Sequence, residues 1–273
     1  PIIELLINRL SSSKYIDQIV LATSDNENNV PLINHVKNLG YEVFIGSEND
    51  VLDRYFYAAK LFEASVVVRI TGDCPLTDSS LVDEVISGFF DSNADYSSNR
   101  EPPTYPDGLD VEVISIKALE EAHEKAKKGF QREHVTPYII DSNTYKKFYQ
   151  RNFKDLSQER WTVDELEDFI VVQNIFNSFH PLINFSWKDV MNLKEKNPEI
   201  FTENQHLIRN EGASMNNGQK LWKRAKRIIP GGNMLLSKRS EMFLPDQWPS
   251  YYKRAKGCKV WDLDGNGYVD MSI

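Results

Sequence analysis

Apolar residues gather in short runs that are separated by longer stretches with helical spacing. The runs at 18–23, 41–46 and 65–70 are nearly continuous in apolar and β-branched residues, which is typical of strands covered on both faces. Helical periodicity fills the intervals at 29–40 and 51–63. This alternation predicts an α/β domain with a largely parallel sheet, whose ligand crevice lies at the carboxyl ends of the strands.

Further elements follow in the same style. We expect strands at 94–99 and 109–115, and helices at 116–128, 132–140, 165–179 and, with a break at Pro198, 186–210. The chain opens with "PIIELLINRL", an amphipathic helix with Pro in its first turn. Because no strand comes before this helix, we expect that the sequence begins inside a domain.

A composition change near residue 214 divides the chain. Residues 1–213 form the α/β domain, and the small, polar residues of 214–218 read as a linker. Residues 219–273 contain a basic helix that ends at Pro-Gly-Gly and the hairpin "KVWDLDGNGYVDMS". Since small domains bury little surface, this last piece is expected to be part of something larger.

The acidic hairpin turn first suggests calcium, because Asp262, Asp264 and Asn266 follow the ligand spacing of an EF-hand loop. The twelfth position, which needs a bidentate Glu, is Ile273. β-formers also precede the loop where a helix is required. A hairpin is therefore favoured over a calcium-binding module.

Composition and charge argue against several classes of function. A net charge of −8 argues against nucleic acid as the main partner. Cys74 and Cys258 lie far apart in dissimilar contexts, so they predict neither a disulfide framework nor a metal site, and a reducing cytoplasm fits best. No apolar run is long enough to span a bilayer, and we expect no membrane partner.

The sharpest chemical signal is "RITGDCPL", in which a buried strand runs into Thr71, Gly72 and Asp73. Glycine permits close backbone approach, and a carboxylate at the end of a strand is suited to Mg²⁺ beside a nucleotide triphosphate. The alternative is a turn in which Asp73 caps the helix that starts near Ser79. The local pattern leaves both open.

A second acidic cluster, "RWTVDELEDF", has a β-like run that ends at Asp164. Asp164 is either a second metal ligand or part of an acidic helix start. In the second case Glu165, Glu167 and Asp168 form the first turn of the helix, and the acidic residues need no metal.

Two more polar stretches are candidates for substrate contacts. "YPDGLDVEV" places Asp107 in a turn and Asp110 and Glu112 on one face of a strand. This face lines a polar pocket or, more often in such patterns, is exposed to solvent. "REHVTPY" contributes Arg132 and His134, and a lone His favours a hydrogen-bonding or interface role over a metal site.

Taken in order, "GSENDVLDRY", "VVVRITGDCPL", "YPDGLDVEV", "REHVTPYI", "TVDELEDF" and "LIRNEG" closely resemble the spore-coat-polysaccharide type of cytidylyltransferase, a relative of the CMP-sugar synthetases. The resemblance implies a glycosyltransferase-A-like nucleotide-binding sheet of Rossmann type. It also implies the transfer of CMP from CTP to an acidic or amino sugar, with release of pyrophosphate, in surface polysaccharide synthesis.

The same resemblance implies roles for individual residues. Asp73 and Asp164 match the Mg²⁺ ligands, although Glu165-Leu166 replaces the usual Thr-Pro after Asp164. The implied nucleotide-binding residues are Asp53, Arg54, Thr71 and Gly72, and the implied sugar-side residues are Asp107, Asp110, Glu112, Arg132 and His134. The alternative for Asp53 and Arg54 is an ordinary pair on a helix surface.

The family begins with a basic loop that wraps the triphosphate, and this sequence starts after it, so we expect little activity from these residues alone. Residues 219–273 resemble the start of class III aminotransferases, which use pyridoxal phosphate on a Lys that would lie beyond Ile273. The expected whole is a cytidylyltransferase joined to an aminotransferase, as a homodimer. The alternative from another class is a non-catalytic nucleotide- or sugar-binding scaffold for the aminotransferase.

Overall fold

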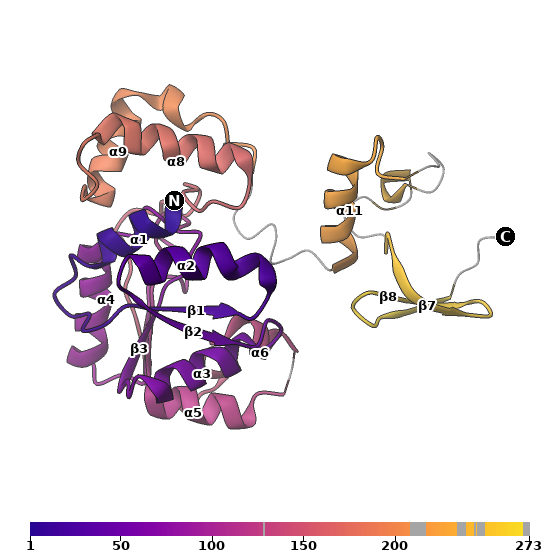
Figure 1. The fold of residues 1–273 in the computed structure, drawn as a ribbon, viewed down its shortest axis with the longest axis horizontal. Coiled ribbons are helices and arrows are strands. Elements are labelled where there is room, and N and C mark those ends of the chain that lie inside the picture. The colour runs from indigo at the N-terminus through magenta and orange to yellow at the C-terminus, as the bar shows by residue number, and fades with distance from the viewer. Residues whose placement is uncertain (128, 208–216, 234–238, 243, 245–248, 270–273) are drawn as a thin grey trace. The chain divides into compact units, whose positions relative to one another are not determined.

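The apolar runs become strands within a residue or two of their predicted positions. The computed structural model describes residues 1–127, 129–207, 217–233, 239–242, 244 and 249–269, in two units, Pro1–Leu207 and Ile208–Ile273. In the first unit the strands lie between helices α1 and α2 on one side and α3 and α5 on the other (Figure 1). Its strands are β1 (Val20–Ser24), β2 (Glu42–Gly46), β3 (Val66–Arg69), β4 (Tyr96–Ser98), β5 (Glu112–Ser115) and β6 (Lys147–Tyr149).

The sheet is mixed, which corrects the prediction of a largely parallel one. β1 pairs with β2 in parallel, and four further strands pair in the order β3-β5-β4-β6. β5 is antiparallel to both β3 and β4, while β4 and β6 are parallel. The loop 99–111 between β4 and β5 contains no helix, so the chain reverses direction there instead of crossing over.

Nine α-helices are described in the first unit, and most match the predicted periodicity. They are α1 (Ile2–Leu10), α2 (Val30–Asn38), α3 (Val51–Leu61), α4 (Ser79–Asp91), α5 (Ile116–Lys125), α6 (Gly129–His134), α7 (Pro137–Asp141), α8 (Leu166–Phe179) and α9 (Trp187–Lys196), with 3₁₀ turns at Glu27–Asn29 and Pro198–Phe201. Within the described residues, no helix is both long enough and apolar enough to cross a bilayer.

Two predicted helices differ from the expectation next to a proline. The helix expected over 132–140 is divided between α6 and α7, because Val135 has a φ of 69°, which lies outside the right-handed helical region. After α9, Pro198 begins only a short 3₁₀ turn. The second helix expected there does not form within the residues described up to Leu207.

β5 is buried on both faces, whereas β2, at one of the predicted apolar runs, has exposed residues at Glu42 and Ile45. Val113 and Ile114 are neighbours in β5, and both are fully buried, but they belong to different hydrophobic clusters. Alternate residues of a strand point to opposite faces. Val113 therefore packs in the cluster with Trp161, whereas Ile114 packs in the cluster with Tyr96.

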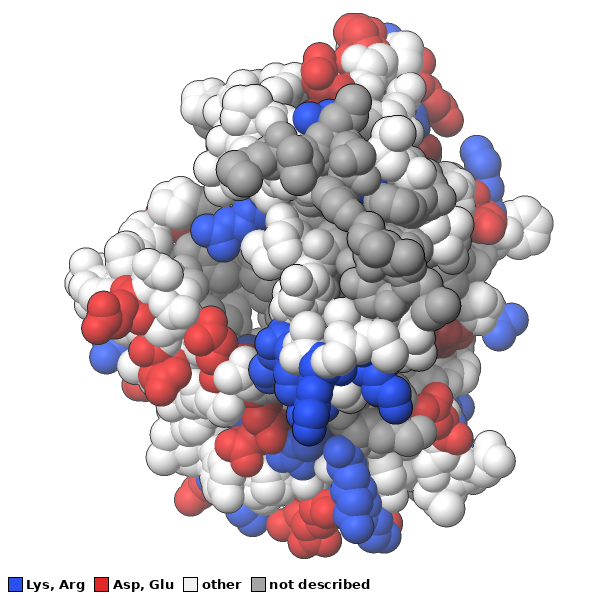
Figure 2. All heavy atoms as spheres, turned by 90° about the vertical axis from the view of Figure 1, so that its right-hand side faces the viewer, with Lys and Arg blue, Asp and Glu red and all other residues white. Residues whose placement is uncertain are grey.

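The second unit is built from α11 (Asn217–Ile228), a 3₁₀ turn (Ser240–Met242), β7 (Tyr252–Lys256), β8 (Lys259–Asp262) and β9 (Gly267–Val269). The predicted basic helix and the β8–β9 hairpin are confirmed, and β7 adds a third strand that the sequence analysis missed. Every residue of β7 is exposed, and Lys and Arg side chains gather on the face of this unit seen in Figure 2. Of the predicted linker, 217–218 begin α11, and 214–216 lie outside the described residues.

Asp262 holds the hairpin turn that first suggested calcium. Its carboxylate accepts hydrogen bonds from the backbone N–H groups of Asp264 and Asn266 and from the hydroxyl of Tyr268. These bonds lower the pKa of Asp262, although burial opposes them. The carboxylate of Asp262 therefore stabilises the hairpin turn.

A buried cation, Arg9, fastens α1 to the rest of the first unit. Its guanidinium donates to four backbone carbonyls, those of Leu76, Thr77, Ile183 and Phe185. Leu76 and Thr77 belong to the segment that leaves β3, so Arg9 anchors the loop that carries Asp73.

We predict that Arg9→Met lowers the free energy of unfolding by about 3 kcal/mol, because it leaves buried carbonyls without a donor. Urea denaturation followed by circular dichroism measures the change. Lys37→Met, on the exposed surface of α2, is the matched control and should change stability by less than about 0.5 kcal/mol. Equal effects of the two substitutions would show that the carbonyl contacts contribute little.

Candidate functional site

Three loops are joined by backbone hydrogen bonds near the end of β3. The N–H of Val163 donates to the carbonyl of Asp73 at 2.8 Å. The N–H of Trp161 donates to the carbonyl of Asp107 at 2.7 Å, and the N–H of Asp107 donates to Glu159 at 2.8 Å. The segments after β3, before β5 and before α8 are thus held together by main-chain atoms.

Gly108 permits this close approach. Its φ is 99°, a conformation that L side chains rarely adopt. A Cβ added there would lie 2.6 Å from the backbone N of Thr162. The predicted turn at Asp107-Gly108 is confirmed, and it presses against 161–162 instead of facing solvent.

This framework brings Asp73 and Asp164 close enough to interact. Burial raises the pKa of Asp164, and so does the negative charge of Asp73, while Arg160 opposes both effects. The side chain of Asp164 is 51% exposed. Among the described residues, Asp73 forms no ion pair with a Lys or Arg, and its carboxylate accepts a weak bond from the thiol of Cys74 at 3.4 Å.

The alternative roles for the two acidic segments have different outcomes. Asp73 does not cap α4; that position is Asp78, whose carboxylate accepts the N–H of Ser80 at 2.8 Å. The helix-start interpretation is confirmed for Glu165, the N-cap of α8, and for Asp168 in its first turn. The β-like run before Asp164 is extended but has only a single bridge, at Arg160, so it is not a strand.

Arg160 compensates the negative charge of the acidic cluster, a role that was not predicted from the sequence. Its guanidinium lies 2.8 Å from Asp164, 2.8 Å from Asp168 and 3.7 Å from Asp107. Its side chain is only 8% exposed. Burial alone would lower the pKa of Arg160, but these carboxylates raise it above its usual value. The position of an Arg four residues before Asp164 was the available signal.

Glu112 is buried, which makes the solvated-face interpretation wrong for this residue. It is 1% exposed and forms an ion pair with Arg69 and a longer one, 3.6 Å, with Arg100. Its other oxygen accepts the hydroxyls of Tyr96 and Thr136, both at 2.7 Å. Burial alone would raise the pKa of Glu112, but the two arginines hold it below its usual value.

The negative charge of Asp110 acts both on Cys74, which is next to Asp73, and on Arg100, which pairs with Glu112. Its negative charge acts on the thiol of Cys74, whose pKa is raised well above its usual value by burial and by Asp73. It also helps to raise the pKa of Arg100 against the effect of burial. Asp110 precedes β5, so it does not share a strand face with Glu112 as predicted.

Asp53 and Arg132, predicted for opposite sides of the site, lie together. The Nε of Arg132 is 2.6 Å from Asp50, and its Nη2 is 3.9 Å from Asp53. The carboxylate of Asp53 also meets the ring of His123 at 2.9 Å. Arg54 turns away and donates to the carbonyl of Ser47, so Asp53 and Arg54 do not pair. His134 is the last residue of α6 and is partly buried.

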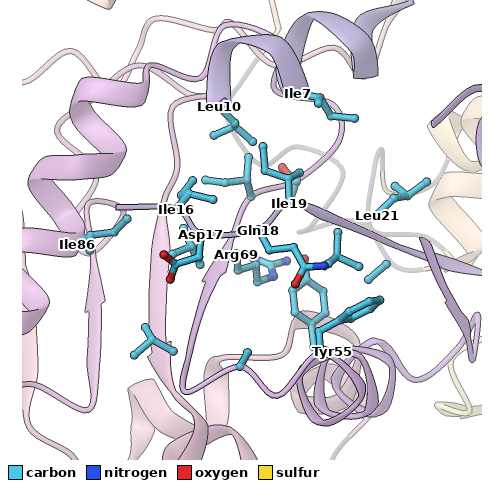
Figure 3. Close-up of a pocket in the computed structure, with 18 of the residues that line it drawn as sticks. Ile7, Leu10, Ile16, Asp17, Gln18, Ile19, Leu21, Tyr55, Arg69 and Ile86 are labelled. Atoms are coloured by element: carbon cyan, nitrogen blue, oxygen red, sulfur yellow. The ribbon is translucent and has the colours of Figure 1, made fainter. Parts of the chain in front are cut away.

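Arg54, Thr71 and Gly72 line a cavity of about 670 Å³ in the first unit. In Figure 3, Leu10 comes down from α1 on one side of this cavity, and Tyr55 rises from α3 on the other. Most of the lining is apolar, contributed by β1, β3 and the surrounding helices. The cavity reaches Gly72, next to Asp73, and its charged lining residues are Asp17, Glu63, Arg54 and Arg69.

The donor set suits a cation that takes few protein ligands. Within the described residues, no group of three or more His, Cys, Asp or Glu side chains could hold a metal. Asp73 and Asp164 are two carboxylates, and Arg160 contacts Asp164 at 2.8 Å. Mg²⁺ commonly binds to one or two carboxylates and completes its shell with water and phosphate oxygens. The pair therefore fits Mg²⁺ and does not fit a closed transition-metal site.

The fold and the site define a nucleotidyltransferase of α/β, Rossmann-like architecture. The cytidylyltransferase family profile matches residues 1–207, and the chain belongs to this family. A solved cytidylyltransferase from Leptospira borgpetersenii superposes with a TM-score of 0.70 at 30% identity, covering 73% of this chain and 85% of that one.

Three curated proteins are similar to parts of this chain. An uncharacterized protein of Methanocaldococcus jannaschii is 38% identical over 76% of this chain and 84% of its own length. The spore coat polysaccharide biosynthesis protein SpsF of Bacillus subtilis is 29% identical over 75% of this chain and 87% of its own length. A glutamate-1-semialdehyde 2,1-aminomutase of Methanothrix thermoacetophila matches over 60 residues, only 13% of its length, at 40% identity.

We predict that Glu112→Gln lowers the free energy of unfolding at pH 7 by about 3 kcal/mol, because two partly buried arginines, Arg69 and Arg100, lose their buried counter-charge. The folded pKa of Glu112 lies below its usual 4.5, so its stabilisation is present above that pH and is lost as the pH falls through the folded pKa. The difference between the wild type and the variant should therefore shrink below about pH 4.5. Urea denaturation at pH 7, 5 and 3.5 measures it.

Glu195→Gln, at an exposed position of α9, is the matched control for this series. It should leave both the stability at pH 7 and the acid slope unchanged. A constant difference between wild type and Glu112→Gln from pH 7 to pH 3.5 would contradict an ionised Glu112 in the folded protein.

Proposed function

We propose that this cytidylyltransferase activates an acidic or amino sugar as its CMP derivative for the synthesis of a surface polysaccharide. A hydroxyl oxygen of the sugar bonds to the α-phosphorus of CTP, the bond from that phosphorus to the leaving pyrophosphate breaks, and the hydroxyl proton passes to water. The kinship with a spore coat polysaccharide biosynthesis protein supports the pathway class. The resemblance to CMP-sugar synthetases supports CTP and the sugar.

The observation that carries the proposal is the hydrogen bond from the N–H of Val163 to the carbonyl of Asp73, which joins the loops that carry Asp73 and Asp164. The negative charge of Asp73 acts on Asp164 and raises its pKa. We assign these two carboxylates to Mg²⁺. When bound, Mg²⁺ supplies positive charge to the phosphate oxygens, where negative charge develops during the transfer. The main-chain bonds hold the two carboxylates in place before the nucleotide arrives, which limits the cost of ordering them.

The charges around the acid pair suggest how substrates are held. Arg160 keeps the acids from repelling one another, and it is assigned a positioning role. Glu112 has both oxygens engaged, so we assign it to orient Arg69 and Arg100 rather than to touch the sugar. We keep the assignment of Asp107 and Asp110 to contacts with the sugar. We keep Thr71, Gly72 and Arg54 on the nucleotide side, with Asp53, Arg132 and His134 as the outer polar group.

The proposal extends to the wider protein. Residues 219–273 are assigned to the beginning of a class III aminotransferase, supported by short matches such as the aminomutase. Pyridoxal phosphate would bind outside these residues, so no residue here is assigned to it. A cytoplasmic homodimer suits a pathway that makes a nucleotide-activated sugar.

We predict that Asp73→Asn and Asp164→Asn each weaken Mg²⁺-dependent CTP binding at least tenfold, or about 1.4 kcal/mol, because each removes one of two anionic ligands. Isothermal titration calorimetry with CTP in Mg²⁺ or EDTA measures the effect. Asp91→Asn, at the exposed end of α4, is the control and should bind CTP as the wild type does.

Pyrophosphate release from each of the four nucleotides with a panel of acidic and amino sugars tests the reaction. The expected result is release with CTP and one sugar class, at a low rate. CTP binding that is equal in Mg²⁺ and EDTA and unchanged by both substitutions would refute the metal assignment. Release with another nucleotide in preference to CTP would refute the substrate assignment.

A further inference from the structure

Asn204 is a buried residue that contacts the charged framework of the site from a distant part of the sequence. It follows the 3₁₀ turn Pro198–Phe201, which packs against α8 and α9, and it is 5% exposed. Its side-chain nitrogen donates to the main-chain carbonyl of Arg160 and to Oδ1 of Asp168, both at 2.9 Å. A carboxamide nitrogen carries two hydrogens, so both of these donors are used.

The carboxylate of Asp168 joins Asn204 to the residues around Asp164. Besides Asn204, its Oδ1 accepts the Nε of Arg160 at 2.9 Å, and its Oδ2 accepts the Nη2 of Arg160 at 2.8 Å. Oδ2 also accepts the backbone N–H groups of Asp164 at 3.2 Å and of Glu165 at 3.1 Å. Asp168 therefore fixes both the guanidinium plane of Arg160 and the main chain at Asp164.

Arg160 connects Asp168 to the side chain of Asp164. The Nη2 atom that binds Asp168 also donates to Oδ2 of Asp164 at 2.8 Å. Because the planar fork of Arg160 is held by Asp168 at two points, the direction of this donor is fixed. The side chain of Asp164 is half exposed, so this donor restricts the rotamers that its carboxylate adopts.

Loss of the Asn204 amide would weaken this arrangement at two points. Oδ1 of Asp168 would lose one of its donors, and the carbonyl of Arg160 would lose the donor that comes from Asn204. Buried groups that lose a hydrogen bond readjust, because it is costly to leave them unpaired. A readjustment of Asp168 against Arg160 changes the place at which Asp164 is held.

We propose that Asn204 is a positioning residue for the transfer reaction: it holds Asp168 and the main chain of Arg160, so that the carboxylate of Asp164 is in place for Mg²⁺ before the nucleotide binds. The inference rests on the proposed function, which assigns Asp164 to the metal. Asn204 acts through Arg160 and Asp168, so its effect on metal-dependent binding requires the carboxylate of Asp164.

The test substitutes Asn204→Leu, which keeps a similar size but removes both donors, in the full chain. Isothermal titration calorimetry gives the dissociation constant of CTP in Mg²⁺ and in EDTA, and the ratio of the two constants is the gain in affinity that the metal provides. We expect Asn204→Leu to lower this gain about fivefold and to leave the affinity in EDTA unchanged. Asn192→Leu, at an exposed position of α9, is the matched control and should keep the gain of the wild type.

Double-mutant cycles test the route through Asp164. The fivefold loss caused by Asn204→Leu should remain in an Asp73→Asn background, where Asp164 is intact, and should fall below about twofold in an Asp164→Asn background. The same loss in both backgrounds, or no loss in either, would overturn the proposal. An equal loss of CTP affinity in Mg²⁺ and in EDTA would also overturn it, because a merely structural role affects both conditions alike.

The failure of this inference is distinguishable from the failure of the metal assignment. If Asp164→Asn keeps the gain of the wild type, the metal assignment is wrong, and this inference is wrong with it. If Asp164→Asn loses the gain and Asn204→Leu keeps it, this inference alone is wrong. If Asn204→Leu does not melt cooperatively, Asn204→Ser, which is too short to reach both acceptors, takes its place with the same expected results.

Discussion

Charge compensation around one buried arginine is the constraint on which the site depends. Asp107, Asp164 and Asp168 surround the guanidinium of Arg160, whose side chain is 8% exposed. In a poorly solvated place, like charges repel strongly, and an uncompensated acid would have to take up a proton. Arg suits this position because its planar fork keeps its charge and reaches several carboxylates at once. The same residue also forms the bridge with Asp107 that joins two loops.

Main-chain contacts fix the loops that carry the candidate site residues, so the geometry of these loops does not depend on flexible side chains. The Val163–Asp73 and Trp161–Asp107 hydrogen bonds tie the loops together, and Gly108 allows the backbones to approach. Arg9 fixes the far end of the Asp73 loop through the carbonyls of Leu76 and Thr77. Preorganised groups of this kind lose little freedom when a charged ligand binds.

The strands and most helices could be predicted, because apolar periodicity records burial directly. Asp73 and Asp164 were found through the order of motifs, and the structure places their loops side by side. The burial of Glu112 could not be predicted, since alternation along a strand gives the face but not what covers it; here Arg69 and Tyr96 come from distant segments. The antiparallel course of β5 depends on pairings with β3 and β4 that local sequence does not encode.

Asp164 and Asp168 share Arg160 as a partner, yet their surroundings give them opposite properties. Asp168 is fully buried, and bonds from Arg160, Asn204 and the N–H of Glu165 lower its pKa, although burial opposes them. Asp164 is half exposed, and burial and Asp73 raise its pKa. A carboxylate with its oxygens already engaged is a poor ligand, whereas one that is repelled by a neighbouring acid is stabilised by any cation placed between them. This difference makes Asp168 part of the buried framework, whereas Asp164, bonded by Arg160 on one oxygen, stays half exposed beside Asp73.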